Sequence, residues 1–167
     1  MCSELIYLSA VAAGAWNIDP TEKTAELVDG GQHVFTSTTR EQLALAVARL
    51  LKKQPAHMKN NSIYIASVEA NMSTWLDAYK QVVGSEGWKV TTVDTKTIIE
   101  RSQGFLASGY FHAGYTGLAL AVCTGPGFMN QFSEVTALAN DELGLPREQD
   151  DIVGIVKRGL ALPNPFA

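Results

Sequence analysis

His112 is the residue whose type and setting best suit proton transfer. It lies within Gly109–Tyr115, a segment dense in glycine and aromatic residues, between Tyr110 and Tyr115. An imidazole exchanges a proton near neutral pH, and a tyrosine hydroxyl can hydrogen-bond a substrate carbonyl. We therefore take His112, Tyr110 and Tyr115 as candidate catalytic residues. The alternative is a histidine packed among aromatic rings, with tyrosines at the edge of the core.

A second group of side chains suits the wall of a pocket for a flat apolar molecule. Phe128, Met129 and Phe132 follow a Gly-Pro-Gly break at positions 125–127, and Trp16 follows the apolar N-terminal segment. Aromatic rings and a flexible thioether adapt well to a planar ligand. These four residues are candidate substrate-binding residues, and ordinary core packing is the alternative.

The remaining polar residues do not form a recognisable catalytic or metal-binding pattern. The histidines at positions 33, 57 and 112 have no metal-ligand spacing, so we predict no metal site. The serines lack the turn that presents a hydrolase nucleophile. Glu134 and Asp141 share one face of a predicted helix, where acidic residues are usually solvated. We expect His57 to be exposed and His33 to be structural.

The composition is that of an ordinary globular chain with a single domain. The sequence has 167 residues, of which 46% are hydrophobic and 18% charged, and a chain of this length buries about 70% of its unfolded surface. The net charge of −4 and the lack of a basic cluster argue against a nucleic-acid partner. No apolar stretch is long enough to cross a membrane. Cys2 and Cys123 form no disulfide framework, so we expect a cytoplasmic location.

Val34–Lys53 is the segment around which the predicted fold is organised. A strand ends near its start, and Thr39 is the expected N-cap of a helix with Gln42 at the third position, which makes a T-x-x-Q capping box. Apolar residues recur at three- and four-residue steps along this helix and predict one apolar face. They are Leu43, Val47, Leu50 and Leu51.

The rest of the chain alternates between predicted strands and helices, which indicates an α/β fold with parallel pairing. The predicted strands are Thr24–Val28 and His33–Thr36, joined by a hairpin or a tight link, then Ser62–Ser67 and Trp88–Val93. The predicted helices are Leu5–Ala15, one starting at Asn71, one starting at Asp94 or Thr95, Thr116–Cys123, Glu134–Leu143 and Asp150–Leu162.

Several of these segments resemble one protein family in their pattern and order. They are the Asp29-Gly30-Gly31 turn with the run from Asn17 to Thr39, the F-T-S-T-T stretch with its alanine-rich helix, and N-D-E-L-G-L-P at Asn140–Pro146. Together they resemble NmrA-like proteins, the atypical short-chain dehydrogenases that include isoflavone-reductase-like enzymes of fungi. The resemblance extends from residue 5 to residue 160, without a strict signature motif.

The resemblance implies that the chain corresponds to the C-terminal portion of an NmrA-like protein. The expected fold is α/β, with a partial Rossmann-like sheet, flanking helices and a helical C-terminal cap after residue 104. Residues 1–61 would then end the Rossmann-like half, and residues 62–167 would form the substrate-binding region. A partial sheet exposes an edge, so we further expect a homodimer, a rearrangement of the strands or poor solubility.

The sequence has no counterpart of the family's dinucleotide-binding motif. A Gly-rich turn after a strand holds the pyrophosphate in Rossmann folds, and no G-x-x-G-x-x-G occurs here. The glycines at 104, 109 and 114 and at 125–127 follow helical patterns and receive no phosphate role. In family terms we expect the N-terminal dinucleotide-binding strands to be absent. No cofactor is therefore predicted from a motif, although the full-length family uses NADP.

The resemblance implies an oxidoreductase-family protein of fungal-type secondary metabolism that acts on or binds a small aromatic or polyketide-like molecule. The residues themselves support only a pocket and not the hydride chemistry. Three alternatives stay open at this point. They are an inactive fragment, a nucleotide-free isomerase or cyclase, and a non-catalytic binding or regulatory module.

Overall fold

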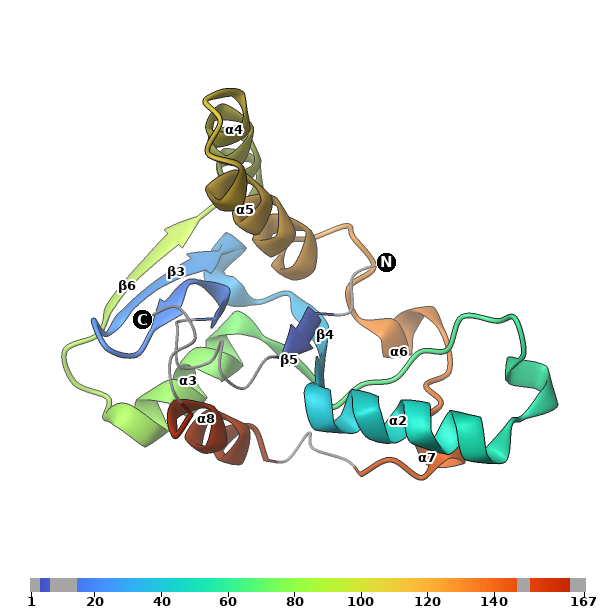
Figure 1. The fold of residues 1–167 in the computed structure, drawn as a ribbon. Coiled ribbons are helices and arrows are strands. Elements are labelled where there is room, and N and C mark those ends of the chain that lie inside the picture. The colour runs from blue at the N-terminus through green and yellow to red at the C-terminus, as the bar shows by residue number, and fades with distance from the viewer. Residues whose placement is uncertain (1–3, 7–14, 147–150, 163–167) are drawn as a thin grey trace.

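The computed structural model describes residues 4–6, 15–146 and 151–162, and it shows a mixed α/β fold with two small sheets (Figure 1). Sheet A has the strand order β1-β4-β5. In it, β1 (Glu4–Ile6) pairs parallel and β5 (Val68–Asn71) pairs antiparallel with β4 (Val34–Thr39). The α/β class is therefore confirmed.

Sheet B has the order β2-β3-β6 and lies beside the first sheet. Its central strand β3 (Thr24–Val28) pairs antiparallel with β2 (Ile18–Asp19) and parallel with β6 (Lys89–Val93). The parallel pairing expected from the order of elements is thus present in both sheets. The predicted strands Thr24–Val28 and Trp88–Val93 are confirmed to within one residue.

Helices surround the two sheets. They are α2 (Arg40–Lys53), α3 (Met72–Val83), α4 (Thr95–Ala107), α5 (Phe111–Thr124), the one-turn α6 (Phe132–Val135) and α7 (Asn140–Leu143), and α8 (Ile152–Leu160), with short 3₁₀ turns at Ala15–Asn17, Asp29–Gly31 and Ala56–Met58. Figure 1 shows α4 and α5 projecting together from the body of the fold. We call this pair of helices the arm.

The main hydrophobic core lies between α3 and the sheets. Trp75 and Tyr79 of α3 are fully buried, and Trp16 packs its ring 4.5 Å from that of Trp75 and 5.7 Å from that of Phe35. Helix α8 covers α3 with Ile155 and Val156. Burial raises the pKa of the Tyr79 hydroxyl. The helix predicted to start at Asn71 is confirmed as α3, with Asn71 as its N-cap.

Helix α2 begins where the sequence predicts, but only half of the predicted capping box forms. Thr39 Oγ1 accepts a hydrogen bond of 3.3 Å from the backbone N–H of Gln42. The Gln42 side chain does not return to the Thr39 backbone. Its Nε2 instead donates to the carbonyl of Ala66 at 2.7 Å, and the Thr39 N–H donates to Ser67 Oγ at 3.0 Å.

Asn140 extends this buried hydrogen bonding to α7. Its Oδ1 accepts from the Ala66 N–H at 3.0 Å, and its Nδ2 donates to the Ala66 carbonyl at 2.6 Å. We call the set formed by Thr39, Gln42, Ala66, Ser67 and Asn140 the Ala66 network. All five residues are buried, so the network ties β4, α2 and α7 to one stretch of backbone.

Of the apolar face predicted for α2, Leu50 packs against the cluster around Ala46, and the other three residues are exposed. Leu43, Val47 and Leu51 are 39%, 48% and 69% exposed, whereas Gln42 and Ala46 are buried. The cause is the hydrogen bond from Gln42 to Ala66. Because this bond points the glutamine inward, the opposite side of the helix faces solvent. Gln42 Oε1 stays buried without a hydrogen-bond partner among the described residues.

The helix predicted at Leu5–Ala15 is wrong where the structure describes it. Leu5 and Ile6 belong to β1, in parallel register with Thr38 and Thr39. Positions 7–14 of the predicted helix lie outside the described residues. An uncharged apolar run does not by itself distinguish a buried helix from a buried strand, and pairing with β4 decides the matter here.

The predicted strand Ser62–Ser67 and the predicted hairpin also need correction. The strand beside β4 is Val68–Asn71, and the residues before it carry no regular ladder. Strands β3 and β4 belong to different sheets, so their connection is the tight link and not a hairpin. The link turns through Gly30 and Gly31, whose φ angles are +75° and +71°.

Two C-terminal helices differ from their predicted bounds. The predicted helix Glu134–Leu143 is broken into α6 and α7, so Glu134 and Asp141 do not share a helix face. The helix is interrupted between Val135 and Asn140 because the Ala139 N–H donates to the Tyr64 carbonyl at 2.8 Å instead of to a helical carbonyl. Tyr64 is close in sequence to Ala66 of the Ala66 network. The last helix begins at Ile152 and ends at Leu160, and position 150 lies outside the described residues.

We predict that Asn140→Ala lowers the free energy of unfolding by about 2–4 kcal/mol, because it leaves a buried N–H and a buried carbonyl short of a partner. Urea denaturation followed by circular dichroism measures this. Asn61→Ala is the matched control, since its amide is exposed and bonds only the His57 carbonyl, and it should change stability by less than about 1 kcal/mol. Equal losses in both variants would contradict the role of the network.

Candidate functional site

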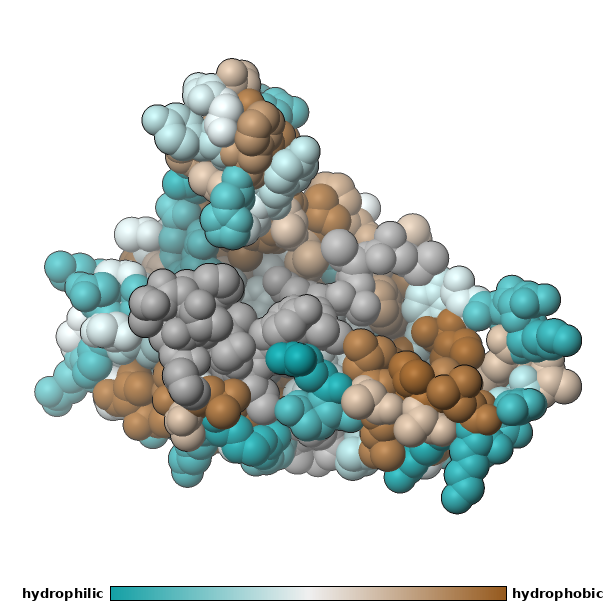
Figure 2. All heavy atoms as spheres, viewed as in Figure 1, coloured by the Kyte–Doolittle hydropathy of each residue, from teal (hydrophilic) through white to brown (hydrophobic). Residues whose placement is uncertain are grey.

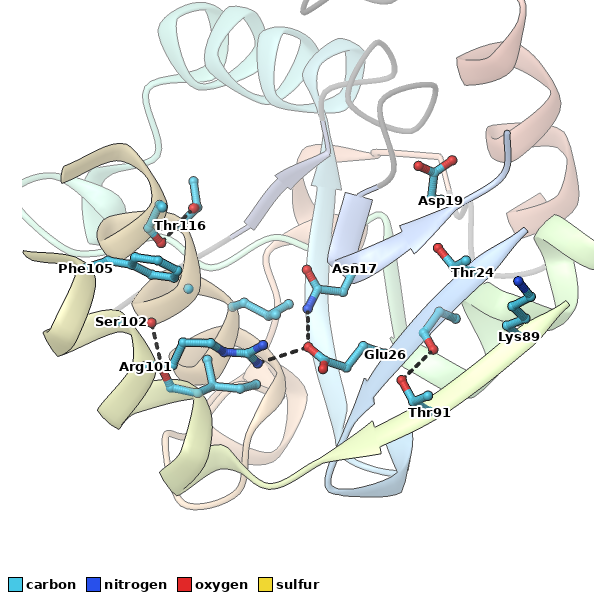
Figure 3. Close-up of a pocket in the computed structure, with 15 residues that line it drawn as sticks. Asn17, Asp19, Thr24, Glu26, Lys89, Thr91, Arg101, Ser102, Phe105 and Thr116 are labelled. Atoms are coloured by element: carbon cyan, nitrogen blue, oxygen red, sulfur yellow. Dashed lines mark hydrogen bonds and ion pairs between the residues drawn. The ribbon is translucent and has the colours of Figure 1, made fainter. Parts of the chain in front are cut away.

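A cleft of about 770 Å³ separates the arm from sheet B (Figure 3). The strands contribute Glu26 and Thr91 to its lining, the 3₁₀ turn before β2 contributes Asn17, and the arm contributes Arg101, Phe105 and Thr116. We call it the arm cleft. It has both polar and apolar walls, as small-molecule sites usually have.

The base of the arm is fixed by two aspartates. Asp94 caps α4, since its Oδ1 accepts from the Thr97 N–H at 2.8 Å and its Oδ2 accepts from the Thr97 hydroxyl at 2.7 Å. These bonds lower the pKa of the Asp94 carboxyl. Asp29 accepts from both the N–H and the hydroxyl of Thr95. The helix start predicted at Asp94 or Thr95 is therefore confirmed, with Asp94 as the cap, and the Asp29-Gly30-Gly31 turn holds the arm in place.

The two helices of the arm approach each other closely through glycines. A Cβ placed on Gly117 would overlap the hydroxyl of Ser102, and one on Gly114 would lie 2.5 Å from Cγ of Leu106. The Ser102 hydroxyl is itself held by the Ile98 carbonyl at 2.7 Å. Small residues in α5 therefore set how closely the two helices of the arm pack.

A charged pair crosses the cleft from the arm to the sheet (Figure 3). Glu26 Oε2 on β3 accepts from Arg101 Nη2 on α4 at 3.0 Å and from Asn17 Nδ2 at 3.2 Å. Among the described residues, Glu26 Oε1 and the other guanidinium N–H groups form no further hydrogen bond. The Arg101 and Glu26 side chains are 45% and 33% exposed. The pair can therefore offer both donors and an acceptor to a ligand.

Phe105 forms an apolar wall beside this pair and is 39% exposed. Ile98 and Leu120 lie deeper in the cleft and are nearly buried. A planar ring lying against Phe105 would keep its substituents close to the polar groups. The arrangement suits binding and orientation of a small molecule.

The three candidate catalytic residues do not line this cleft. Most of the Gly-rich segment that contains them is helical. Helix α5 begins at Phe111 and includes His112 and Tyr115. Tyr110 and Tyr115 are 67% and 63% exposed, and His112 is also exposed. Tyr110 packs its ring edgewise on Phe105, with centroids 6.4 Å apart. The structure therefore places these residues towards solvent, and their catalytic role stays a prediction.

The four candidate substrate-binding residues are separated by the fold. Phe128 and Met129 line a second cleft, of about 500 Å³, near the start of β4. Phe132 is buried against Tyr64, with ring centroids 5.3 Å apart. Trp16 belongs to the core. The structure thus brings together Phe128 and Met129 and places the other two in packing roles.

Glu26 and Arg101 were not predicted from the sequence as site residues. Glu26 stands between the buried residues Ala25 and Leu27 of an alternating strand. An acid at that position of a strand can indicate a functional face, although it usually indicates only a solvated one. No local signal connects Glu26 with Arg101, because the two residues are 75 positions apart.

Within the described ranges, no three histidine, cysteine or acidic residues lie close enough to hold a metal ion. His57 is exposed, as predicted, and its Nε2 lies 3.1 Å from Glu142 Oε1. Of the helices that the structure describes, none has the length and apolar character needed to cross a membrane. Cys123 is buried and forms no disulfide with a residue in the described part of the chain.

Comparison with known proteins does not place the chain in a family. No protein-family model matches the chain, and neither the curated proteins nor the solved structures gave a match.

We predict that Gly117→Ala lowers the free energy of unfolding by about 1–3 kcal/mol, because the added methyl group forces α4 and α5 apart. Gly104→Ala on α4 is the matched control. A Cβ placed on Gly104 would have no atom within 4 Å, and removing a helical glycine should stabilise the protein by up to about 1 kcal/mol. Chemical denaturation measures both. Stabilisation by Gly117→Ala would contradict the close packing of the arm.

Proposed function

We propose that this chain is the substrate-binding part of an NmrA-like oxidoreductase, and that the arm cleft receives a small planar aromatic molecule. The observation that carries the proposal is the Glu26–Arg101 pair, with unused hydrogen-bonding groups beside an exposed aromatic wall. The resemblance of the sequence to NmrA-like proteins supports the family. The parallel pairs β1–β4 and β3–β6 are compatible with a partial Rossmann-like sheet.

The chemistry of the cleft indicates which substituents the ligand carries. The guanidinium group of Arg101 can donate to a carbonyl oxygen, and Glu26 Oε1 can accept from a hydroxyl. Because the two side chains are in contact at 3.0 Å, they can bind neighbouring substituents on one ring. An aromatic ketone with an adjacent hydroxyl, as in polyketide-like molecules, has this pattern. A ring packed on Phe105 adds about 0.5–1.5 kcal/mol beyond its burial.

In this proposal the chain binds and orients the substrate, and the hydride donor is a dinucleotide. The glycines at 104, 114 and 117 lie within helices of the arm, so none of them provides a strand-to-helix turn for a pyrophosphate. The chain's own contribution is to fix the carbonyl and its neighbouring hydroxyl. The arm also keeps part of the water away from them.

A nucleotide-free binding module or isomerase is the second candidate. It is favoured by the position of His112, Tyr110 and Tyr115, which face solvent and do not converge on the cleft. A site that the candidate catalytic residues do not reach suits binding better than turnover. This candidate shares the ligand class with the first and differs in its need for NADPH.

We predict that the chain binds o-hydroxyacetophenone and that Arg101→Ala weakens this binding about tenfold, because a charge-assisted hydrogen bond is lost. Isothermal titration calorimetry measures the dissociation constants. Acetophenone, which lacks the hydroxyl, should bind more weakly to the unaltered chain. Arg158→Ala is the control, since this arginine pairs with Asp151 on the surface. Equal effects of both substitutions would count against the arm cleft.

Titration with NADPH distinguishes the two candidates. If this chain also contacts the dinucleotide without a Gly-rich turn, the oxidoreductase proposal predicts a saturable heat or fluorescence change in the micromolar range, or tighter binding of NADPH in the presence of o-hydroxyacetophenone. Binding of this kind would rule out the nucleotide-free candidate. Binding of the aromatic probe alone, with no NADPH effect at millimolar concentration, would favour the binding module instead.

A further inference from the structure

One face of α2 carries large apolar side chains that no described residue covers. Leu43, Val47 and Leu51 lie on it, and it includes a shallow groove of about 540 Å³ that Ala44 and Ala48 also line. Figure 2 shows a broad hydrophobic patch over α2. We call this surface the α2 face. Exposed apolar patches of this kind usually mark an interaction site.

We propose that the α2 face binds the same face of a second copy of this chain, with the two α2 helices antiparallel across a twofold axis. The apolar residues recur four positions apart along the helix, so that one stripe meets an identical stripe. A twofold axis beside Val47 pairs Leu43 of each copy with Leu51 of the other. Antiparallel helices also place opposite dipole ends together.

Charges beside the stripe identify a second copy as the occupant. Glu41 and Lys52 are both exposed and have no ion-pair partner among the described residues. At 3.6 residues per turn, they project within about 20° of each other around the helix, beside the edge of the α2 face that Ala48 forms. In an antiparallel pair related by a twofold axis, the same side of each helix lies on the same side of the interface. Glu41 of one copy then lies within about 1.5 Å, along the axis, of the level of Lys52 in the other.

The same arrangement places two opposite-charge contacts symmetrically at the ends of the interface. A partner with a different sequence would need an apolar stripe with an acidic residue near one end and a basic residue near the other. A second copy already has both. Helix α2 has 14 residues and is therefore about 21 Å long. A helix pair of that length buries less than the roughly 800 Å² per partner of a standard interface. We therefore expect a reversible dimer.

Sedimentation velocity over a range of concentrations tests this dimer. We expect the full chain to dimerise reversibly, and Val47→Asp to raise the dimer dissociation constant at least about tenfold, because it buries a charge without a partner. Val135→Asp is the matched control. Val135 is 46% exposed on α6, compared with 48% for Val47, and its substitution should leave the dimer unchanged. Circular dichroism verifies that both variants fold.

A charge exchange tests the antiparallel orientation separately from hydrophobicity. Glu41→Lys should weaken the dimer, and adding Lys52→Glu should restore it, since each end again carries opposite charges. Both changes oppose the dipole of α2, so helix stability cannot explain the recovery. A monomer at all concentrations, a dimer unaffected by Val47→Asp, or failure of the double variant to recover would each overturn the proposal. These outcomes are independent of ligand binding in the arm cleft.

Discussion

The backbone of Ala66 is the constraint on which the arrangement of this fold depends. Its carbonyl accepts from the side chains of both Gln42 and Asn140, and its N–H donates to Asn140. A buried polar group without a partner costs about 1–3 kcal/mol. These hydrogen bonds fix how α2 and α7 lie against the backbone of Ala66, and they leave the leucines on α2 partly exposed. The exposed α2 face is a direct consequence of this constraint.

The arm cleft depends on a second polar contact, between the Asp29 carboxylate and Thr95. Asp29 begins the turn that links the two sheets, so one short segment fixes both the junction of the sheets and the base of the arm. Asp94 then starts α4, which carries Arg101 towards Glu26 on β3. The proposed ligand site is therefore set by the same contacts that hold the fold together.

The sequence predicted features that depend on neighbouring residues. Thr39, Asn71 and Asp94 were all predicted at helix starts and all act as caps, because each bonds a backbone N–H three residues later. The buried side of α2 was not predictable, since Gln42 and Ala66 are 24 residues apart. The pair Glu26–Arg101 was missed for the same reason. Aromatic density around residue 112 suggested a site, but the start of α5 turns those side chains to solvent.

The proposed ligand, a small aromatic molecule, binds between the arm and sheet B. Residue-resolved NMR of the ¹⁵N-labelled chain during titration with o-hydroxyacetophenone tests this binding most directly. The account predicts that the backbone amide signals of Asn17, Glu26 and Gly117 shift together along one saturable curve. Shifts confined to residues 125–131, or shifts that grow linearly without saturation, would contradict it.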